Sequence, residues 1–506
     1  MAASRFVLIP GQNHFNREQA LSSSAFMARS ARLIHRGSPS RIPIREENNG
    51  IPAMNVIASL EAGQGMEAML VELDDTQRLA LRTTYPDLRV VQEGTAEMAF
   101  ARATLQPIPL ATMAGTTLAT STLTIRVKTE TGKPVSKAQV DLITNARTDP
   151  PTGISGITNA KGEIKLIVPK ALRRASCLRV EPQHSYWHRA ESDVSWSGTR
   201  PTLEVVCPGI SQPFDDALQK LGVAGQDHDG EGVVVAVIDG GAGAHRGLPD
   251  FTGANFARTD RPSGDIGDNG IGHGTHVAGI IASRRSRGGI QGMAPGVTLR
   301  IYRVYEKGSV TTGAFSVAAA IHRAVEDGAD IINLSLTLPK PDPSVTLQLQ
   351  RARAAGVICV AAAGNAGGDV LPPAQDDAVL GVSALGWKGT WPKGAAQVLD
   401  VRAKPAGKNK KLFVAKFSCV GPEIDLAGPG VGIVSLYPKH RFAVMNGTSM
   451  AAPAVAGAIA RKLAGDPAIL SMPRGQARSN AIVALALNSA RSLGFPTRFQ
   501  GSGIVV

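Results

Sequence analysis

The sequence predicts an α/β protein whose largest part is a doubly wound, mostly parallel sheet, preceded by a small α+β unit and a β-sandwich module. In the C-terminal part, continuous apolar runs such as residues 233–238 alternate with helical stretches, which is typical of strand-helix units in a parallel sheet. Residues 122–207 instead alternate strictly between apolar and polar positions, as sandwich strands do. The length of 506 residues allows about three domains at roughly 150 residues each.

The composition is that of a folded protein with a basic surface. Hydrophobic residues make up 43% of the chain and charged residues 19%, which excludes disordered and collagen-like chains. Lys and Arg outnumber Asp and Glu by 54 to 41, but the cationic residues are dispersed and no basic helix alternates with aromatic residues. We therefore expect no nucleic-acid partner. Because no apolar run approaches the roughly 18 residues that span a bilayer, we expect no membrane partner either.

The N-terminus predicts no standard signal peptide. Its apolar run, residues 6–9, is shorter than the roughly 7–15 residues of a secretory core segment. The compartment therefore stays open between the cytoplasm and export by a non-standard route.

Changes in composition and in hydrophobic periodicity divide the chain into five segments. These are a flexible arm at 1–50, an α+β unit at 51–100, a linker at 101–121, a β-sandwich at 122–207 and a parallel α/β domain at 212–506. Within the α+β unit, strands are predicted near residues 56–58, 69–71 and 88–91. Asp74 caps the intervening helix and Pro86 ends it.

The predicted sandwich contains two of the four cysteines, Cys177 and Cys207. Both lie near predicted strands, so a bridge between them stays open, but the sequence does not fix its geometry. Four cysteines are too few and too far apart for a disulfide framework or a CxxC metal site.

Asp239 ends the apolar run at 233–238, so its carboxylate lies at the carboxyl end of a buried strand. Ligands of parallel sheets bind at that end, which favours a functional role. The competing interpretation is a dinucleotide-binding turn, since Gly241 and Gly243 give GxG. The third glycine position holds Arg246, which argues against it.

Two histidines, His273 and His276, stand three residues apart at the start of an apolar helix. A zinc pair would need further ligands, and no HExxH pattern is present. His276 fits a packed core histidine. His273 is bracketed by glycines that let a substrate chain approach, so we favour it as a general base.

Ser449 lies at the start of a small-residue helix, where Pro453 is tolerated only near the first turn. A serine there is commonly an N-cap. It also suits a nucleophile, because its backbone N–H points to where an oxyanion forms. Asn365, which follows another buried strand, is locally an ordinary turn residue. The coincidence of Asp, His, Asn and Ser in such positions favours a catalytic role for them.

Four motifs carry a resemblance to a known family. They are Ala-Val-Ile-Asp at 236–239, His-Gly-Thr-His-Val-Ala-Gly at 273–279, Gly-Asn at 364–365 and Gly-Thr-Ser-Met-Ala-Ala-Pro at 447–453. In type and order these motifs resemble the signatures of the subtilisin-like serine proteases. The resemblance covers roughly residues 212–506.

The resemblance implies an endopeptidase that hydrolyses polypeptides without a required cofactor. It implies that Ser449 is the nucleophile, His273 its base, Asp239 the residue that orients His273, and Asn365 an oxyanion donor. The stretch Asn333, Leu334, Ser335 and Leu336 would be the edge strand that pairs with substrate. Thr337 stands where the family usually has glycine, which bears on specificity.

The resemblance has two further implications outside the catalytic motifs. The stretch 54–93 resembles the propeptide-inhibitor unit of these proteases, which predicts a zymogen whose N-terminal segment is an intramolecular inhibitor, cut within 94–121. Structural calcium occurs in relatives, and Asp250 is a candidate ligand, but no partner loop is recognisable and no metal is predicted. Residues 387–412 predict a surface loop.

Two rival functions remain at this stage. A catalytically silent binding protein with a protease fold is disfavoured because all four catalytic positions are filled. A nucleotide-binding protein is disfavoured because the glycine pattern is incomplete.

Overall fold

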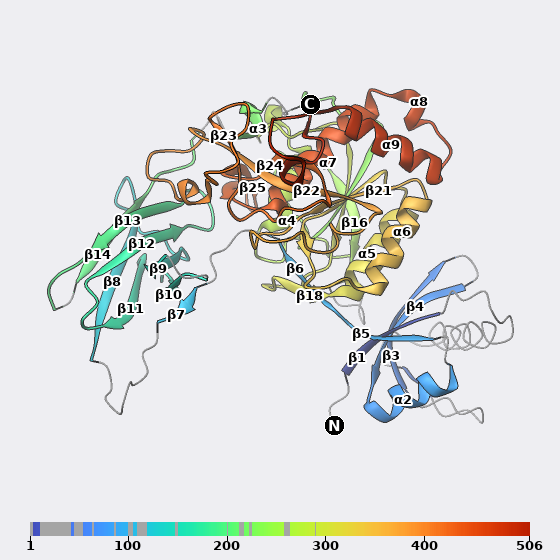
Figure 1. Cartoon of the computed structure of the whole chain (residues 1–506), viewed down its shortest axis with the longest axis horizontal. Coiled ribbons are helices and arrows are strands. Elements are labelled where there is room, and N and C mark those ends of the chain that lie inside the picture. The colour runs from blue at the N-terminus through green and yellow to red at the C-terminus, as the bar shows by residue number, and fades with distance from the viewer. Residues whose placement is uncertain are drawn as a thin grey trace.

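The computed structural model describes residues 4–10, 42–44, 54–62, 65–85, 88–99, 105–108, 119–146, 150–199, 201–211, 217–221, 225–257, 264–288 and 290–506. These residues form an N-terminal α+β unit, a two-sheet module and a large α/β domain (Figure 1). No described helix has the length and apolar character needed to cross a membrane.

The N-terminal unit is an antiparallel sheet with one helix. Its strand order is β2-β3-β4-β1-β5. The elements are β1 (Ser4–Ile9), β2 (Ile42–Ile44), β3 (Met54–Ala62), β4 (Gly65–Leu73), α2 (Asp75–Thr84) and β5 (Arg89–Gln92). Asp74 caps α2 in a capping box with Gln77, as the sequence predicts for the start of this helix.

The prediction of a flexible arm over residues 1–50 is wrong for β1. This strand lies between β4 and β5, and its residues Phe6 to Ile9 are all buried. A strand covered on both faces shows a continuous apolar run rather than alternation, and four apolar residues in a polar segment give no periodic signal. Residues 42–44 also pair, with β3.

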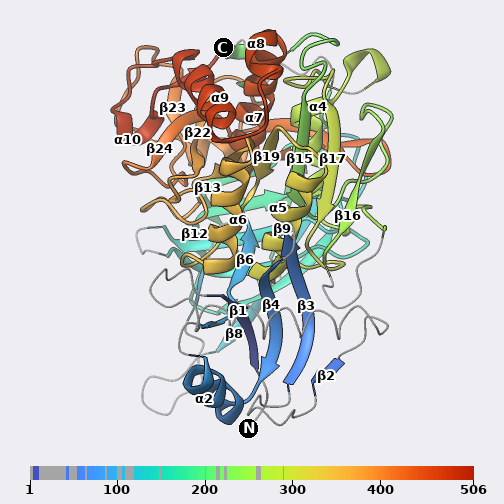
Figure 2. The ribbon, with the colours of Figure 1, turned by 90° about the vertical axis from the view of Figure 1, so that its right-hand side faces the viewer.

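The two faces of β4 pack against different partners. Met69, Val71 and Leu73 pack with Leu81 of α2 in the unit's own core. Ala68 and Leu70 instead belong to a cluster shared with helices α5 (Ala314–Glu326) and α6 (Pro343–Ala354) of the α/β domain. Figure 2 shows this sheet beneath those two helices. The period-2 alternation of a strand therefore builds both a core and an interface.

Two short strands follow the N-terminal sheet, one inside the predicted α+β unit at 51–100 and one inside the predicted linker at 101–121. Strand β6 (Thr95–Met98) lies between β18 (Thr311–Gly313) and β20 (Leu336–Thr337) of the α/β domain, antiparallel to both. Strand β7 (Gln106–Pro107), inside the predicted linker, pairs with the two-sheet module.

The two-sheet module consists of sheets ordered β13-β12-β9-β10-β7 and β11-β8-β14 around one apolar core. Its strands are β8 (Thr120–Thr129), β9 (Gln139–Asn145), β10 (Thr152–Ile157), β11 (Glu163–Pro169), β12 (Arg174–Glu181), β13 (Arg189–Ser195) and β14 (Thr202–Cys207). Two pairings, β8 with β14 and β7 with β10, are parallel, whereas the alternating pattern of the sequence is typical of antiparallel sandwich strands. Cys177 and Cys207 are both buried and unbridged.

The α/β domain is built on a sheet ordered β16-β17-β15-β19-β21-β22-β23, with β24 paired to β22. These pairings are parallel except that of β22 with β23. The sheet strands are β15 (Val234–Asp239), β16 (Phe251–Asn255), β17 (Thr298–Arg303), β19 (Ile331–Leu334), β21 (Ile358–Ala362), β22 (Val379–Trp387), β23 (Leu412–Val414) and β24 (Ile424–Pro429).

Helices cover both faces of this sheet. Helices α4 (His273–Ala282) and α7 (Thr448–Ala464) share one core with Val235 and Val237 of β15, while α5 and α6 share the other with Ala236 and Ile238. The domain is thus doubly wound, as predicted. The remaining elements are α3 (Ala217–Lys220), β25 (Ile433–Tyr437), β26 (Arg441–Met445), α8 (Pro467–Leu470), α9 (Gln476–Asn488), β27 (Ala490–Arg491), α10 (Thr497–Gln500) and β28 (Ile504–Val505).

Candidate active site

Asp239 and His273 meet at the carboxyl end of the sheet. Asp239 is the last residue of β15 and His273 the first of α4, and both side chains are buried. His273 Nδ1 lies 2.9 Å from each carboxylate oxygen of Asp239, so it donates to that carboxylate. Asp239 Oδ1 also accepts from Gly240 N at 2.6 Å. These bonds fix the carboxylate and orient the imidazole ring.

The turn that begins α4 depends on a glycine. Gly272 has φ 82°, and a Cβ there would lie 2.1 Å from the ring of Tyr437. The carboxylate of Asp268 accepts from Gly270 N at 2.7 Å, Gly272 N at 3.2 Å and Thr275 Oγ1 at 3.1 Å. Asp268 therefore organises the loop that presents His273, a role the sequence analysis missed. The sequence signal for this role is an aspartate shortly before the start of a predicted helix, because such a residue can form an Asx turn.

His276 is a structural histidine. Its Nε2 lies 3.1 Å from the carbonyl oxygen of Ile433 and 3.2 Å from that of Ala443. Burial lowers the pKa of His276 to about 3, with the neighbouring His273 acting in the same direction. The neutral ring thus joins α4 to the β25–β26 hairpin, in agreement with the core interpretation of the sequence.

Ser449 is the second residue of α7, and its backbone is held by an unusual contact. Pro453 lies inside α7 rather than in its first turn, a difference from the prediction. Because proline has no N–H, the carbonyl oxygen of Ser449 four residues earlier loses its helical donor. It accepts from Ser335 Oγ at 2.9 Å instead, and Asn333 Nδ2 donates to Ser335 Oγ at 3.0 Å.

Hydrogen bonds to Thr448 hold the side chain of Asn365 so that its Nδ2 points at the carbonyl oxygen of Ala99. Its Oδ1 accepts from the backbone N–H of Thr448 at 2.9 Å and from Thr448 Oγ1 at 3.0 Å. Its Nδ2 donates to the backbone carbonyl oxygen of Ala99. The same carbonyl oxygen accepts from Ser449 N at 3.2 Å. Two donors from different elements thus converge on one peptide oxygen.

Ala99 directly follows strand β6, whose hydrogen bonds fix the position of the Ala99 carbonyl oxygen. Met98 N donates to Val310 O at 3.0 Å, and Ala99 N donates to Ser335 O at 3.2 Å. Ser449 Oγ donates to the same Ser335 carbonyl oxygen at 3.1 Å. The extended segment that ends at Ala99 therefore lies between β18 and β20, with the carbonyl oxygen of Ala99 next to Ser449.

One part of the predicted substrate-pairing strand is wrong. Asn333 and Leu334 lie in β19, which pairs with β15 on one side and β21 on the other, so they have no free edge. The pairing edge is β20, where Leu336 pairs with Met98 and Thr337 with Glu97. Ser335, between the two strands, contributes its carbonyl oxygen. A β-branched residue at 337 therefore still supports backbone pairing.

No group of three or more His, Cys, Asp or Glu side chains in the described ranges gathers as a metal site requires. Among the four catalytic candidates, Asn365 and Ser449 contact the carbonyl oxygen of Ala99, while Asp239 and His273 contact each other.

Comparison with known proteins identifies the family. The model of the Subtilase family matches residues 230–503, which run from just before β15 to the turn before β28. The chain belongs to the subtilase family.

Individual relatives support the same family assignment. Subtilisin BL of Lederbergia lenta is 35% identical over 299 residues, which cover 59% of this chain and 95% of the relative. Subtilisin DY of Bacillus licheniformis is 34% identical over 254 residues, or 49% of this chain and 82% of the relative. The alkaline protease of Shouchella clausii is 35% identical over 299 residues, covering 67% of its own length. This subtilase is therefore a subtilisin-like serine peptidase, a hydrolase.

Proposed function

We propose that this subtilase is a serine endopeptidase made as a zymogen and that it cuts its own chain between Ala99 and Phe100. The supporting observation is the carbonyl oxygen of Ala99, which accepts from Asn365 Nδ2 and from Ser449 N. A pair of donors on a peptide oxygen stabilises the oxyanion that forms when a nucleophile adds to the carbonyl carbon.

The proposed chemistry follows from the contacts at this bond. Ser449 Oγ leaves its hydrogen bond to Ser335 O by rotation about its Cα–Cβ bond, gives its proton to His273 Nε2 and adds to the Ala99 carbonyl carbon. Asp239 stabilises the imidazolium that results. His273 then returns the proton to the nitrogen of Phe100 as the C–N bond breaks. Water hydrolyses the acyl-enzyme by the same steps, and no cofactor takes part.

The N-terminal unit is proposed to be the inhibitor. Its sheet packs on α5 and α6 through Leu70 and neighbouring apolar residues. Its tail engages the starts of both helices: the Phe315 N–H donates to the Glu93 carboxylate, and Gly94 N donates to Asp342 Oδ2 at 3.2 Å. These contacts persist after the cut, because all of them lie before Ala99.

The two-sheet module is proposed to be the predicted β-sandwich and to remain in the mature enzyme. Its residues follow Ala99 in the chain, so a cut there leaves the module joined to the α/β domain. Polypeptide substrates are proposed to replace β6 between β18 and β20, with Leu336 and Thr337 as the pairing edge.

The test is covalent labelling with a fluorophosphonate, followed by peptide mapping and an assay with a peptide anilide. We expect one label on Ser449, hydrolysis by the wild type, and loss of both in Ser449→Ala. The matched control is Ser471→Ala, because Ser471 caps the C-terminus of α8 and its hydroxyl donates to Pro467 O and Ala468 O. Absence of both label and hydrolysis in the wild type would favour the silent binding protein instead.

A further inference from the structure

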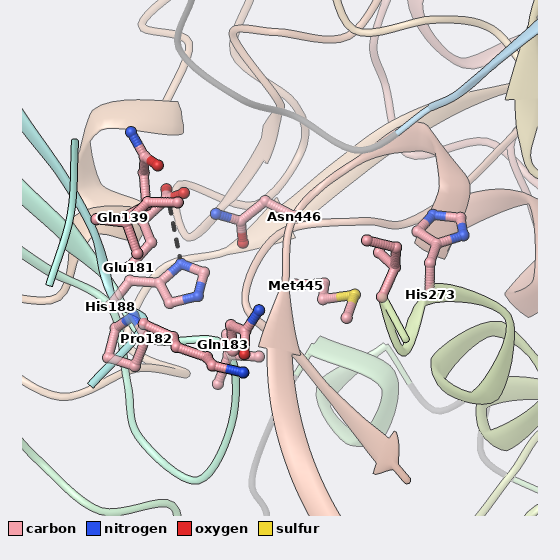
Figure 3. Close-up of a pocket in the computed structure, with 12 residues that line it drawn as sticks. Gln139, Glu181, Pro182, Gln183, His188, His273, Met445 and Asn446 are labelled. Carbon is pink, nitrogen blue, oxygen red and sulfur yellow. Dashed lines mark ion pairs between the residues drawn. The ribbon is translucent and has the colours of Figure 1, made fainter. Parts of the chain in front are cut away.

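A cavity of ≈ 150 Å³ lies beside the catalytic candidate His273 and is lined by both the α/β domain and the two-sheet module. The module contributes Lys137, Ile157, Glu181 and His188, and the domain contributes Ile271 and Met445. Figure 3 shows Met445 between His273 and the module residues His188 and Glu181. Sequence pattern alone assigns no role to the module.

Backbone hydrogen bonds fix the module against the domain at this cavity. Ser185 N donates at 2.7 Å to the carbonyl oxygen of Phe442, which lies in the hairpin strand β26 that also carries Met445. Ala190 N donates to Gly394 O, and Ala396 N donates to His188 O, both at 3.1 Å. The domain residues of the last two bonds, Gly394 and Ala396, belong to the segment 387–412, which the sequence predicts to be a surface loop. That prediction is wrong for its centre, which is the docking platform of the module.

The chain that follows the proposed cut leads to the two-sheet module. The residues before the proposed cut occupy β6, on the side of β18 and β20. The next described residue after Ala99 is Leu105, and it precedes β7, which pairs with the module strand β10. Gln106 N donates to Pro151 O at 2.8 Å. Seven residue steps lead from Ala99 to Gln106, so at about 3.5 Å per residue their Cα atoms are at most roughly 25 Å apart.

The cavity combines an apolar rim with a paired acidic residue on its floor, and the exposed Lys137 also lines it. Ile157 is 62% exposed, among the most exposed of the large apolar side chains that the structure describes, and Met445 and Ile271 are half-buried. On the floor, Glu181 forms an ion pair with Arg179. Burial lowers the pKa of His188, so its ring is neutral near pH 7. A large apolar side chain fits this rim, whereas a carboxylate would lose hydration against Ile157 and Met445 and gain only a surface contact with the exposed Lys137, worth about 0–1 kcal/mol.

We propose that the two-sheet module forms the outer wall of the leaving-group side of the active site, where it binds a large apolar side chain carried by the substrate within two residues after the cut. This inference rests on the proposed endopeptidase function. It gives the module a part in substrate choice, since contact with that side chain stabilises the complex only when the substrate extends past the bond. A substrate that ends at the bond does not reach the module.

Two kinds of substrate separate the two sides of the cleft. Ala-Glu-Met-Ala p-nitroanilide carries residues 96–99 and no peptide beyond the bond. Quenched-fluorescence peptides carry the same four residues followed by Phe-Ala-Arg, Ala-Phe-Arg or Asp-Ala-Arg. For the self-processed wild type we expect either phenylalanine peptide to exceed the aspartate peptide about tenfold in kcat/KM.

The variants are Ile157→Asp and its matched control Ile167→Asp, an isoleucine that is 48% exposed on β11 of the same module. The readout is the ratio of kcat/KM for the better phenylalanine peptide to that for the anilide. We expect Ile157→Asp to lower this ratio about tenfold, mainly through KM, Ile157→Leu to restore it, and Ile167→Asp to leave it within about twofold of the wild type.

The outcomes separate this inference from the function it rests on. Equal ratios for Ile157→Asp and Ile167→Asp, with the anilide hydrolysed, would overturn the inference and leave the endopeptidase intact. A wild type that prefers the aspartate peptide would do the same. A wild type that hydrolyses neither substrate kind would overturn both.

Discussion

Replacing Leu70 by alanine should loosen the N-terminal unit from the α/β domain. Leu70 is 0% exposed and belongs to the cluster that joins β4 to α5 and α6. Its neighbour Val71 points to the opposite face and packs in the unit's own core. The substitution at 70 therefore acts on the interface, while the core beneath α2 keeps its side chains.

The size of the effect follows from the burial. A fully buried leucine side chain contributes about 1.5–3 kcal/mol relative to an exposed one. Since every 1.4 kcal/mol is tenfold in a dissociation constant, we expect the unit to bind roughly 10- to 150-fold more weakly. The lower end applies if the surrounding alanine side chains of α5 move into the space left by the three missing carbons.

The assay uses the self-processed complex, in which the cut unit remains bound. Serial dilution releases the unit, and the protein concentration at which half of the anilide-hydrolysing activity appears reports the dissociation constant. Leu79→Ala is the matched control, because this leucine on α2 is 67% exposed. Half-activation of Leu70→Ala within twofold of the control would show that this interface does not hold the inhibitor.

Three further predictions concern the site and its surroundings. Asn365→Ala should lower kcat for the anilide by about 10²–10³-fold with little change in KM, the range known for the corresponding donor in a subtilisin; an unchanged kcat would contradict its oxyanion role. Burial raises the pKa of Asp400 to about 7, so the folded protein holds this proton more tightly than the unfolded chain and loses stability as pH rises from about 4 to 7. Urea unfolding in a Ser449→Ala background should show a flatter pH dependence for Asp400→Asn, and an unchanged slope would refute the assignment. Burial also raises the pKa of Glu93, so the inhibitor unit should bind most tightly below pH 4.5 and weaken as pH rises through the raised value. Dilution assays of Glu93→Gln at several pH values should lack that trend.

The sequence was sufficient to predict which residues meet at the sheet edge. Asp239 follows a buried parallel strand and His273 begins a helix, and carboxyl ends of parallel strands share one edge, so their approach follows from local pattern and topology. The two histidines also differ in their contacts, because His273 Nδ1 lies against the Asp239 carboxylate whereas His276 Nε2 lies against two backbone carbonyl oxygens.

The contacts that were missed are non-local. Residues 95–98 have no core of their own, and their partners at 311–313 and 336–337 lie more than 200 residues away, so nothing in their neighbourhood indicates a strand. Strand β1 is similarly recognisable only beside β4 and β5. The assignment of Asn333 to an edge failed for the same reason, because sequence pattern does not reveal whether a strand has one neighbour or two.

The central claim is that Ser449 cuts the chain after Ala99, and N-terminal sequencing with intact mass tests it most directly. Wild type and Ser449→Ala are purified in parallel without protease inhibitors. The account predicts two fragments in the wild type, the larger beginning at Phe100, and an uncut chain in Ser449→Ala. An uncut wild type, a new N-terminus elsewhere, or the same cut in the variant would contradict it.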